Sequence, residues 1–204
     1  MMPCSISKDL IEKTIAFHGH SCPGLAIGIR VAELVLQKLG PCGQSDLVAV
    51  VETDMCGVDA IQFLTGCTFG KGNLIHKDYG KMAHSFYDRN RDVGFRAVLR
   101  PDISGKMGSE LHSLMKKVAD GNAHEGERAR YNELRKALKD RYMDADLDEM
   151  FIVMEPVFPI PRPARILESL GCEVCGEMAM ESRTWRLRGK TLCLPCFEKR
   201  EQKT

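Results

Sequence analysis

The chain has 204 residues, 44% of them hydrophobic, and a formal net charge of +1. This length allows one substantial domain and a small second one, and the near-neutral charge gives no electrostatic reason to expect binding to nucleic acid or to an anionic membrane. We expect no membrane span and no signal peptide, because the sequence has neither an apolar run of about eighteen residues nor a basic N-terminal region followed by an apolar one. Nine cysteines, with two metal-type pairs and an odd total, indicate a reducing cytoplasm.

Most of the chain predicts a mixture of helices and strands. Capping residues and apolar periodicity predict helices over residues 8–17, 23–39, 58–64, 109–119 and 127–142. Apolar runs bounded by polar or glycine turns predict strands over residues 47–51, 73–76, 83–87, 94–99 and 151–154. Ser7 is expected to cap the first helix, and Gly66 to end the third.

The segment FHGHSCPG, between the first two helices, places His18, His20 and Cys22 at alternate positions. Pro23 disfavours the α region for Cys22, so we expect an extended chain in which alternate side chains share a face. Three metal ligands could then converge, and the helix N-terminus behind them favours a thiolate. In the structural alternative, one histidine caps a backbone group and Cys22 fills the core. A turn at Gly19 could point one histidine away, so the sequence leaves open which histidine is a ligand.

A second cluster of candidate ligands follows the predicted strand 47–51. Glu52, Asp54 and Cys56 come at the C-terminal end of this strand, where functional residues of α/β sheets gather, and Cys67 ends the next helix. With the histidine segment, this cluster could form one metal site of His and Cys ligands, with Glu52 or Asp54 as a general base. Otherwise the two carboxylates cap the next helix. The glycine-rich stretch after Cys67 lacks the spacing of a phosphate loop and favours a simple turn.

Four prolines between residues 156 and 163 cannot continue a helix or a central strand, and they predict a stiff, extended linker. We therefore expect three parts in the chain. These are a core over residues 1–158, a proline-rich linker over residues 159–165 and a small domain over residues 166–204.

The small domain carries the most specific motif, two CxxC pairs with seventeen residues between them. Each pair offers two thiolates from one tight turn, and two such turns complete a tetrahedral zinc site. The expected ligands are Cys172, Cys175, Cys193 and Cys196. Disulfides or a redox CxxC would be the alternatives, but the βαβ context of a redox motif is missing. Gly176 suits the turn after the first pair, and two strands (178–185 and 186–192) and a helix (194–203) are expected.

Three motifs of the first part, in this order, resemble the E-subunit family of formylmethanofuran dehydrogenase. They are FHGHSCPG from Phe17 to Gly24, then Cys56 with DAIQ from Asp59, then TGCT from Thr65 with GKGNL from Gly70. The tail resembles the DksA/TraR-type C4 zinc finger, which some members carry. The resemblance implies an α+β core with a mixed or antiparallel sheet and packed helices. It also implies a homodimer and a metal, zinc, near the histidine-cysteine segment.

These features leave three hypotheses for function. The first is a zinc-binding accessory protein or subunit related to molybdenum or tungsten formylmethanofuran dehydrogenase, whose partner subunits would supply any redox chemistry, because the chain has no ferredoxin-type cysteine run. The second is a stand-alone zinc enzyme in which His18 or His20, Cys22 and Cys56 leave one position open. The third is a nucleic-acid or transcription-linked protein that binds through basic residues around Trp185. Nine basic and six acidic residues from position 159 onward are too weak an imbalance to favour the third.

Overall fold

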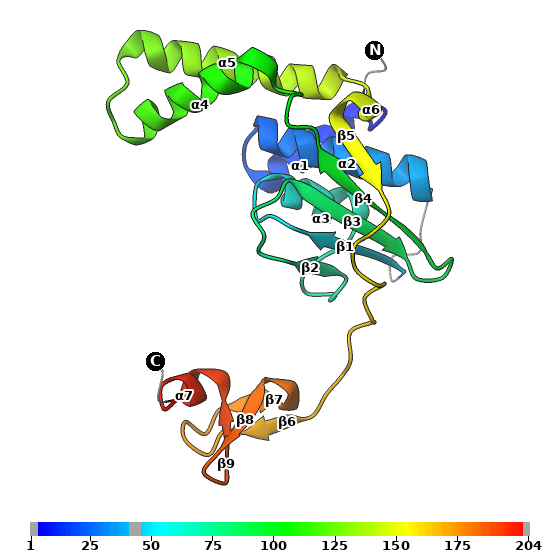
Figure 1. The fold of residues 1–204 in the computed structure, drawn as a ribbon, viewed down its shortest axis with the longest axis vertical. Coiled ribbons are helices and arrows are strands. Elements are labelled where there is room, and N and C mark those ends of the chain that lie inside the picture. Colours follow the sequence, from blue (N-terminus) through cyan, green and yellow to red (C-terminus); the bar gives the residue numbers. More distant parts are fainter. Residues whose placement is uncertain (1–3, 41–45, 202–204) are drawn as a thin grey trace. The chain divides into compact units, whose positions relative to one another are not determined.

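The computed structural model describes residues 4–40 and 46–201. It forms two compact units, residues 1–163 and 164–204, which are described separately (Figure 1). Among the described residues, no helix is both long enough and apolar enough to cross a bilayer.

The first unit contains six helices and five strands in the described part of the chain. The helices are α1 (Lys8–His18), α2 (Pro23–Leu39), α3 (Gly57–Thr65), α4 (Gly105–Ala119), α5 (Glu125–Asp144) and α6 (Leu147–Met150). The strands are β1 (Leu47–Val51), β2 (Leu74–His76), β3 (Ala83–Asp88), β4 (Val93–Leu99) and β5 (Phe151–Met154). All the predicted helices and strands of this unit are confirmed, although α4 begins earlier than predicted and the short α6 was not predicted.

Local signals account for several of these boundaries. The Ser7 hydroxyl accepts a hydrogen bond of 3.3 Å from the Leu10 N–H, which caps α1 as predicted. Gly66 ends α3 with a φ of 70°, a left-handed conformation that glycine adopts without steric cost. At the start of α5, His124 and Glu127 form a reciprocal capping box that the sequence pattern did not predict.

The five strands form one mixed sheet in the order β2-β1-β3-β4-β5. Strands β1 and β2 are parallel and are joined through α3, whereas the other neighbouring pairs are antiparallel. Alternate residues serve the two faces: Ala49, Val51 and Phe86 pack in the main core with α2, while Val48, Val50 and Tyr87 form a separate cluster. The α+β class and the mixed sheet are therefore confirmed.

The proline-rich segment packs on the second face of this sheet. The Tyr87 hydroxyl donates a hydrogen bond of 3.0 Å to the Phe158 carbonyl, and Phe158 and Ile160 contact the cluster of Val48, Val50 and Tyr87. Prolines cannot join the sheet as a central strand, but they suit an extended segment that covers it. At least as far as residue 162 this segment is held by the first unit.

The second unit is built from short elements in the described residues. They are β6 (Ser169–Gly171), β7 (Met178–Met180), the 3₁₀ turn η1 (Glu181–Arg183), β8 (Thr184–Leu187), β9 (Lys190–Cys193) and α7 (Leu194–Glu198). The predicted single strand 178–185 is wrong: η1 interrupts it, and β7 instead pairs with β6, which was not predicted. The predicted last helix is shorter than expected, and its proposed end reaches residues 202–203, which lie outside the described residues.

Candidate metal centres

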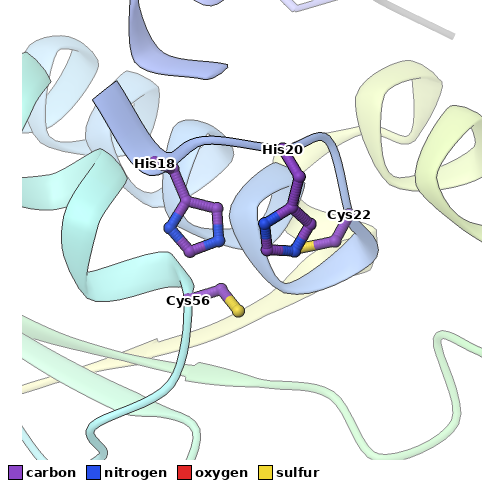
Figure 2. A group of neighbouring side chains, drawn as sticks. All are labelled: His18, His20, Cys22 and Cys56. Carbon is purple, nitrogen blue, oxygen red and sulfur yellow. The ribbon is translucent and has the colours of Figure 1, made fainter. Parts of the chain in front are cut away.

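The first unit brings four of the predicted ligands together. One ligand atom from each of His18, His20, Cys22 and Cys56 lies within 4.8 Å of the other three. Figure 2 shows the four side chains pointing toward one another. They come from the end of α1, the loop after it, and the residues just before α2 and α3.

The loop between α1 and α2 takes the shape that its sequence predicts. Gly19 ends α1 with a φ of 91°, and this left-handed turn redirects the chain so that the His18 and His20 rings lie 4.4 Å apart. Cys22 is extended (φ −150°, ψ 164°), as expected before Pro23, and its sulfur accepts a hydrogen bond of 3.3 Å from the Leu25 N–H. Both histidines therefore reach the cysteine side of the loop.

Cys56 joins this group because α2 and α3 pack backbone against backbone. A Cβ added to Gly28 would lie 2.5 Å from the Gly57 Cα, a distance that no real side chain tolerates. One turn earlier on α2, a Cβ on Gly24 would lie 3.3 Å from the Cys56 Cβ. Glycines at these points let the N-termini of the two helices approach, and each N-terminus carries one cysteine.

Asp59 fixes the orientation of the His18 ring. Its Oδ2 lies 2.7 Å from His18 Nδ1, and the carboxylate accepts a hydrogen bond from that nitrogen. The other ring nitrogen, Nε2, is buried and has no partner among the described residues. A carboxylate on one imidazole nitrogen and a free lone pair on the other is the usual arrangement of a metal-binding histidine. The sequence analysis did not assign Asp59 to the site, although its place three residues after Cys56 on α3 is a signal that could have found it.

The electrostatics of the group also suit a cation. Burial raises the pKa of the Cys56 thiol, and the nearby Cys22 sulfur raises it further. A bound cation reverses this effect, because it stabilises both thiolates. Two imidazole nitrogens and two sulfurs form a donor set that suits Zn²⁺, and four atoms within 4.8 Å fit its tetrahedral coordination. The residues present therefore fit a zinc ion.

Two other residues of the predicted cluster do not join it. Glu52 accepts hydrogen bonds of 2.6 and 2.8 Å from the Arg96 guanidinium, which lowers the pKa of this carboxyl. It is buried in that pair and neither caps α3 nor is free to act as a base. The buried Cys67 thiol donates to the Leu47 carbonyl over 3.4 Å, away from the four ligands.

A hollow of about 310 Å³ adjoins the group, with His18 and Cys56 in its wall. It lies beyond the carboxyl ends of the parallel strands β1 and β2, the usual place for a ligand in such sheets. Asp54, which follows β1, and His76, which ends β2, also line it. His76 was not predicted to take part in a site.

The second unit brings the four predicted ribbon cysteines together. One sulfur from each of Cys172, Cys175, Cys193 and Cys196 lies within 4.8 Å of the others. Hydrogen bonds from backbone N–H groups, including that of Cys193, lower the pKa of the Cys172 thiol to about 6, as expected for a thiolate ligand. Gly176 has a φ of 77° in the turn after the first pair, as predicted.

Comparisons with known proteins agree with these two groups. Residues 17–152 match the family model described as FmdE, molybdenum formylmethanofuran dehydrogenase operon, and residues 165–202 match the prokaryotic dksA/traR C4-type zinc finger. A crystal structure of an FmdE-like protein of the tungsten formylmethanofuran dehydrogenase type, from Syntrophus aciditrophicus, matches with a TM-score of 0.63 and 25% identity, over 98% of each chain.

A curated relative is the probable S-adenosyl-L-methionine-binding protein of Archaeoglobus fulgidus. It is 32% identical to this chain over 203 residues, which are 95% of this chain and 54% of the relative. The chain thus spans about half the length of that relative.

Proposed function

The chain belongs to the FmdE family, and from this premise we propose that it is a zinc-binding accessory protein related to molybdenum or tungsten formylmethanofuran dehydrogenase. The observation that carries the proposal is the convergence of four ligand atoms in the first unit. Four protein ligands complete the tetrahedron of zinc, as in sites that hold the metal, whereas catalytic sites keep one position open. The C4 ribbon holds a second zinc and provides a separate small unit for contact with a partner. Its reduced cysteines agree with a cytoplasmic protein.

Elemental analysis of the full chain tests the two centres. We expect two zinc ions per chain in the wild type and one in either Cys22→Ala or Cys172→Ser. A wild-type stoichiometry of one that Cys22→Ala leaves unchanged would refute the centre in the first unit.

The closed ligand set is tested by comparing the two histidines. If His20 completes the tetrahedron, His18→Ala and His20→Ala should both weaken zinc retention against a chelator. If only His18→Ala does so, the centre has three protein ligands and the accessory role loses its main support.

The accessory role itself requires a partner. We expect the zinc-loaded chain to form a complex of fixed stoichiometry with purified molybdenum or tungsten formylmethanofuran dehydrogenase subunits in analytical ultracentrifugation. Cys172→Ser should weaken this complex if the ribbon is the contact module. Independent sedimentation of all components would contradict the proposal.

A zinc enzyme is the second candidate, because the hollow of about 310 Å³ opens beside His18 and Cys56. In this case His20, which is exposed, leaves one position to a substrate, and zinc supplies Lewis-acid chemistry there. With Glu52 held by Arg96, Asp54 is the remaining candidate base. The name of the Archaeoglobus relative makes S-adenosyl-L-methionine the first small molecule to test in the hollow. Saturable binding that Met55→Trp abolishes would favour this candidate.

We also propose that the chain forms a homodimer. Helix α4 buries none of its residues and leaves Met115 46% exposed, so it has apolar surface available for a second copy. Light scattering on the full chain should give twice the chain mass, and a monomer at micromolar concentration would rule the dimer out.

A further inference from the structure

A basic hollow beside the start of α2 is used by neither zinc centre. It has a volume of about 300 Å³ and is lined by Ser21, Pro23, Asn132, Arg135, Lys136 and Lys139. We propose that this hollow binds the carboxylate of a small anionic ligand whose short apolar tail extends toward Cys22. This inference goes beyond the proposed accessory role and does not depend on it.

The charge of the hollow is largely uncompensated. Arg135 and Lys139 are four residues apart on α5 and share one face of that helix. Among the described residues neither Arg135 nor Lys136 forms an ion pair, and only Lys139 has an acidic neighbour, Asp140 at 2.8 Å. The Arg135 guanidinium stacks 5.5 Å from the centre of the Tyr131 ring, which positions the charge without neutralising it.

Another arginine on the same helix shows the contrast. Arg130 bonds Glu110 at 2.8 Å and Glu133 at 2.8 Å, so its charge is matched by two carboxylates. The excess of positive charge is therefore local to the hollow and is not a property of α5 as a whole. Guanidinium and ammonium donors favour a carboxylate, because such hydrogen bonds are stronger than neutral ones.

The other lining groups agree with an anion. Ser21 and Asn132 can donate hydrogen bonds from a hydroxyl and an amide. Helix α2 has no acidic residue in its first turn, so the partial positive charge of its N-terminus is not offset there.

A narrower cavity continues from the basic hollow and defines the tail. It shares Ser21 and Lys139 with the hollow, has a volume of about 70 Å³, and reaches Cys22. Its remaining wall is apolar and is formed mainly by Ile11, Ile15, Leu25, Ile29 and Met143. Since one water molecule occupies roughly 30 Å³, this space suits a tail of a few carbon atoms. The combination of a cationic entrance and an apolar end specifies a short-chain carboxylate.

The test is an NMR titration of the zinc-loaded full chain with acetate, butyrate and inorganic phosphate at low ionic strength. We expect butyrate to saturate, to perturb the amides of Ser21 and Lys139, and to bind about tenfold more tightly than acetate, because its extra methylenes enter the apolar cavity. Arg135→Gln should weaken butyrate binding by about tenfold through loss of a charged hydrogen bond. Arg130→Gln is the matched control and should leave it unchanged. Zinc content and melting temperature confirm that both variants are folded.

Several outcomes would overturn the proposal. These are the absence of saturation by butyrate, equal affinities for butyrate, acetate and phosphate, or equal weakening by Arg130→Gln and Arg135→Gln. If a single-stranded oligonucleotide binds at these residues and butyrate does not, the hollow is part of a nucleic-acid surface instead. Because zinc content is measured separately, failure of the titration would leave the accessory role standing.

Discussion

Gly28 of α2 and Gly57 of α3 lie backbone against backbone, with no room for a Cβ on Gly28. This contact brings the two helices close enough for Cys22 and Cys56, one before each helix, to face a common point. The candidate metal centre therefore depends on two residues that have no side chain and no chemistry of their own.

Gly28→Ala should consequently disrupt both the fold and the centre. The added methyl group must push α3 away, and overpacking of this kind lowers the free energy of unfolding by about 1–3 kcal/mol, more than the helix propensity of alanine restores. Thermal unfolding and zinc analysis should show a lower melting temperature and less than two zinc ions per chain. Gly70→Ala is the control, because a Cβ there meets nothing within 4 Å. Equal stability and zinc content of the two variants would contradict the argument.

Asp59→Asn should weaken zinc binding without unfolding the chain. The carboxylate orients the His18 ring through Nδ1, and loss of such a partner typically lowers metal affinity by about 10–100-fold. Competition with a chromophoric chelator measures this change. Asp54→Asn changes a carboxylate in the same hollow that makes no hydrogen bond among the described residues, so it should keep the wild-type affinity. If Asp54→Asn lowers affinity as much as Asp59→Asn, the effect is general electrostatics and not ring orientation.

His84 should make stability depend on pH. It is fully buried on β3 and neither ring nitrogen has a partner among the described residues, and burial lowers its pKa from the ordinary value of 6.5 to about 4. The unfolded chain therefore binds a proton that the folded chain excludes, so the free energy of unfolding is highest above pH 6.5 and falls as the pH decreases toward 4. Between pH 7 and pH 5 the loss from this residue should be about 2 kcal/mol.

Urea unfolding of His84→Leu at pH 7 and pH 5 checks this expectation. The variant should lose less stability between the two values than the wild type. Release of zinc in acid affects both proteins and cancels in the difference. The exposed His112 supplies the control, since His112→Leu should follow the wild type. Parallel pH curves for wild type and His84→Leu would show that His84 is not the sensitive group.

Cys172→Ser should unfold the second unit and spare the first. The cluster around Cys172, Leu192, Cys193 and Cys196 is small, so zinc binding contributes much of the stability of this unit. Limited proteolysis should remove residues after about 163 and leave the rest intact. Cys4→Ser, which changes a cysteine outside both clusters, should stay resistant. Degradation of the whole chain in Cys172→Ser would mean that the two units do not fold independently.

Features set by neighbouring residues could be predicted from the sequence. Pro23 made Cys22 extended, Gly19 allowed the turn between the two histidines, Ser7 capped α1, and the spacing of the CxxC pairs predicted the ribbon cluster. Each of these depends on steric and hydrogen-bonding preferences within a few residues, which are present in the sequence itself. Alternation of apolar residues likewise predicted the strands and the helices that pack on them.

Features that join distant residues were decided by the tertiary structure. Glu52 looked like a catalytic base until Arg96, 44 positions away, was found against it. Asp59 and His18 are 41 positions apart, and the proline-rich segment covers a sheet face through Tyr87, 71 positions from Phe158. No local preference encodes such pairs, because each forms only after the sheet order and the close contact of α2 and α3 have placed both partners. The sequence alone thus determined the ligand types and the local turns, and the packing of the helices on the sheet decided which ligands meet and which carboxylate supports them.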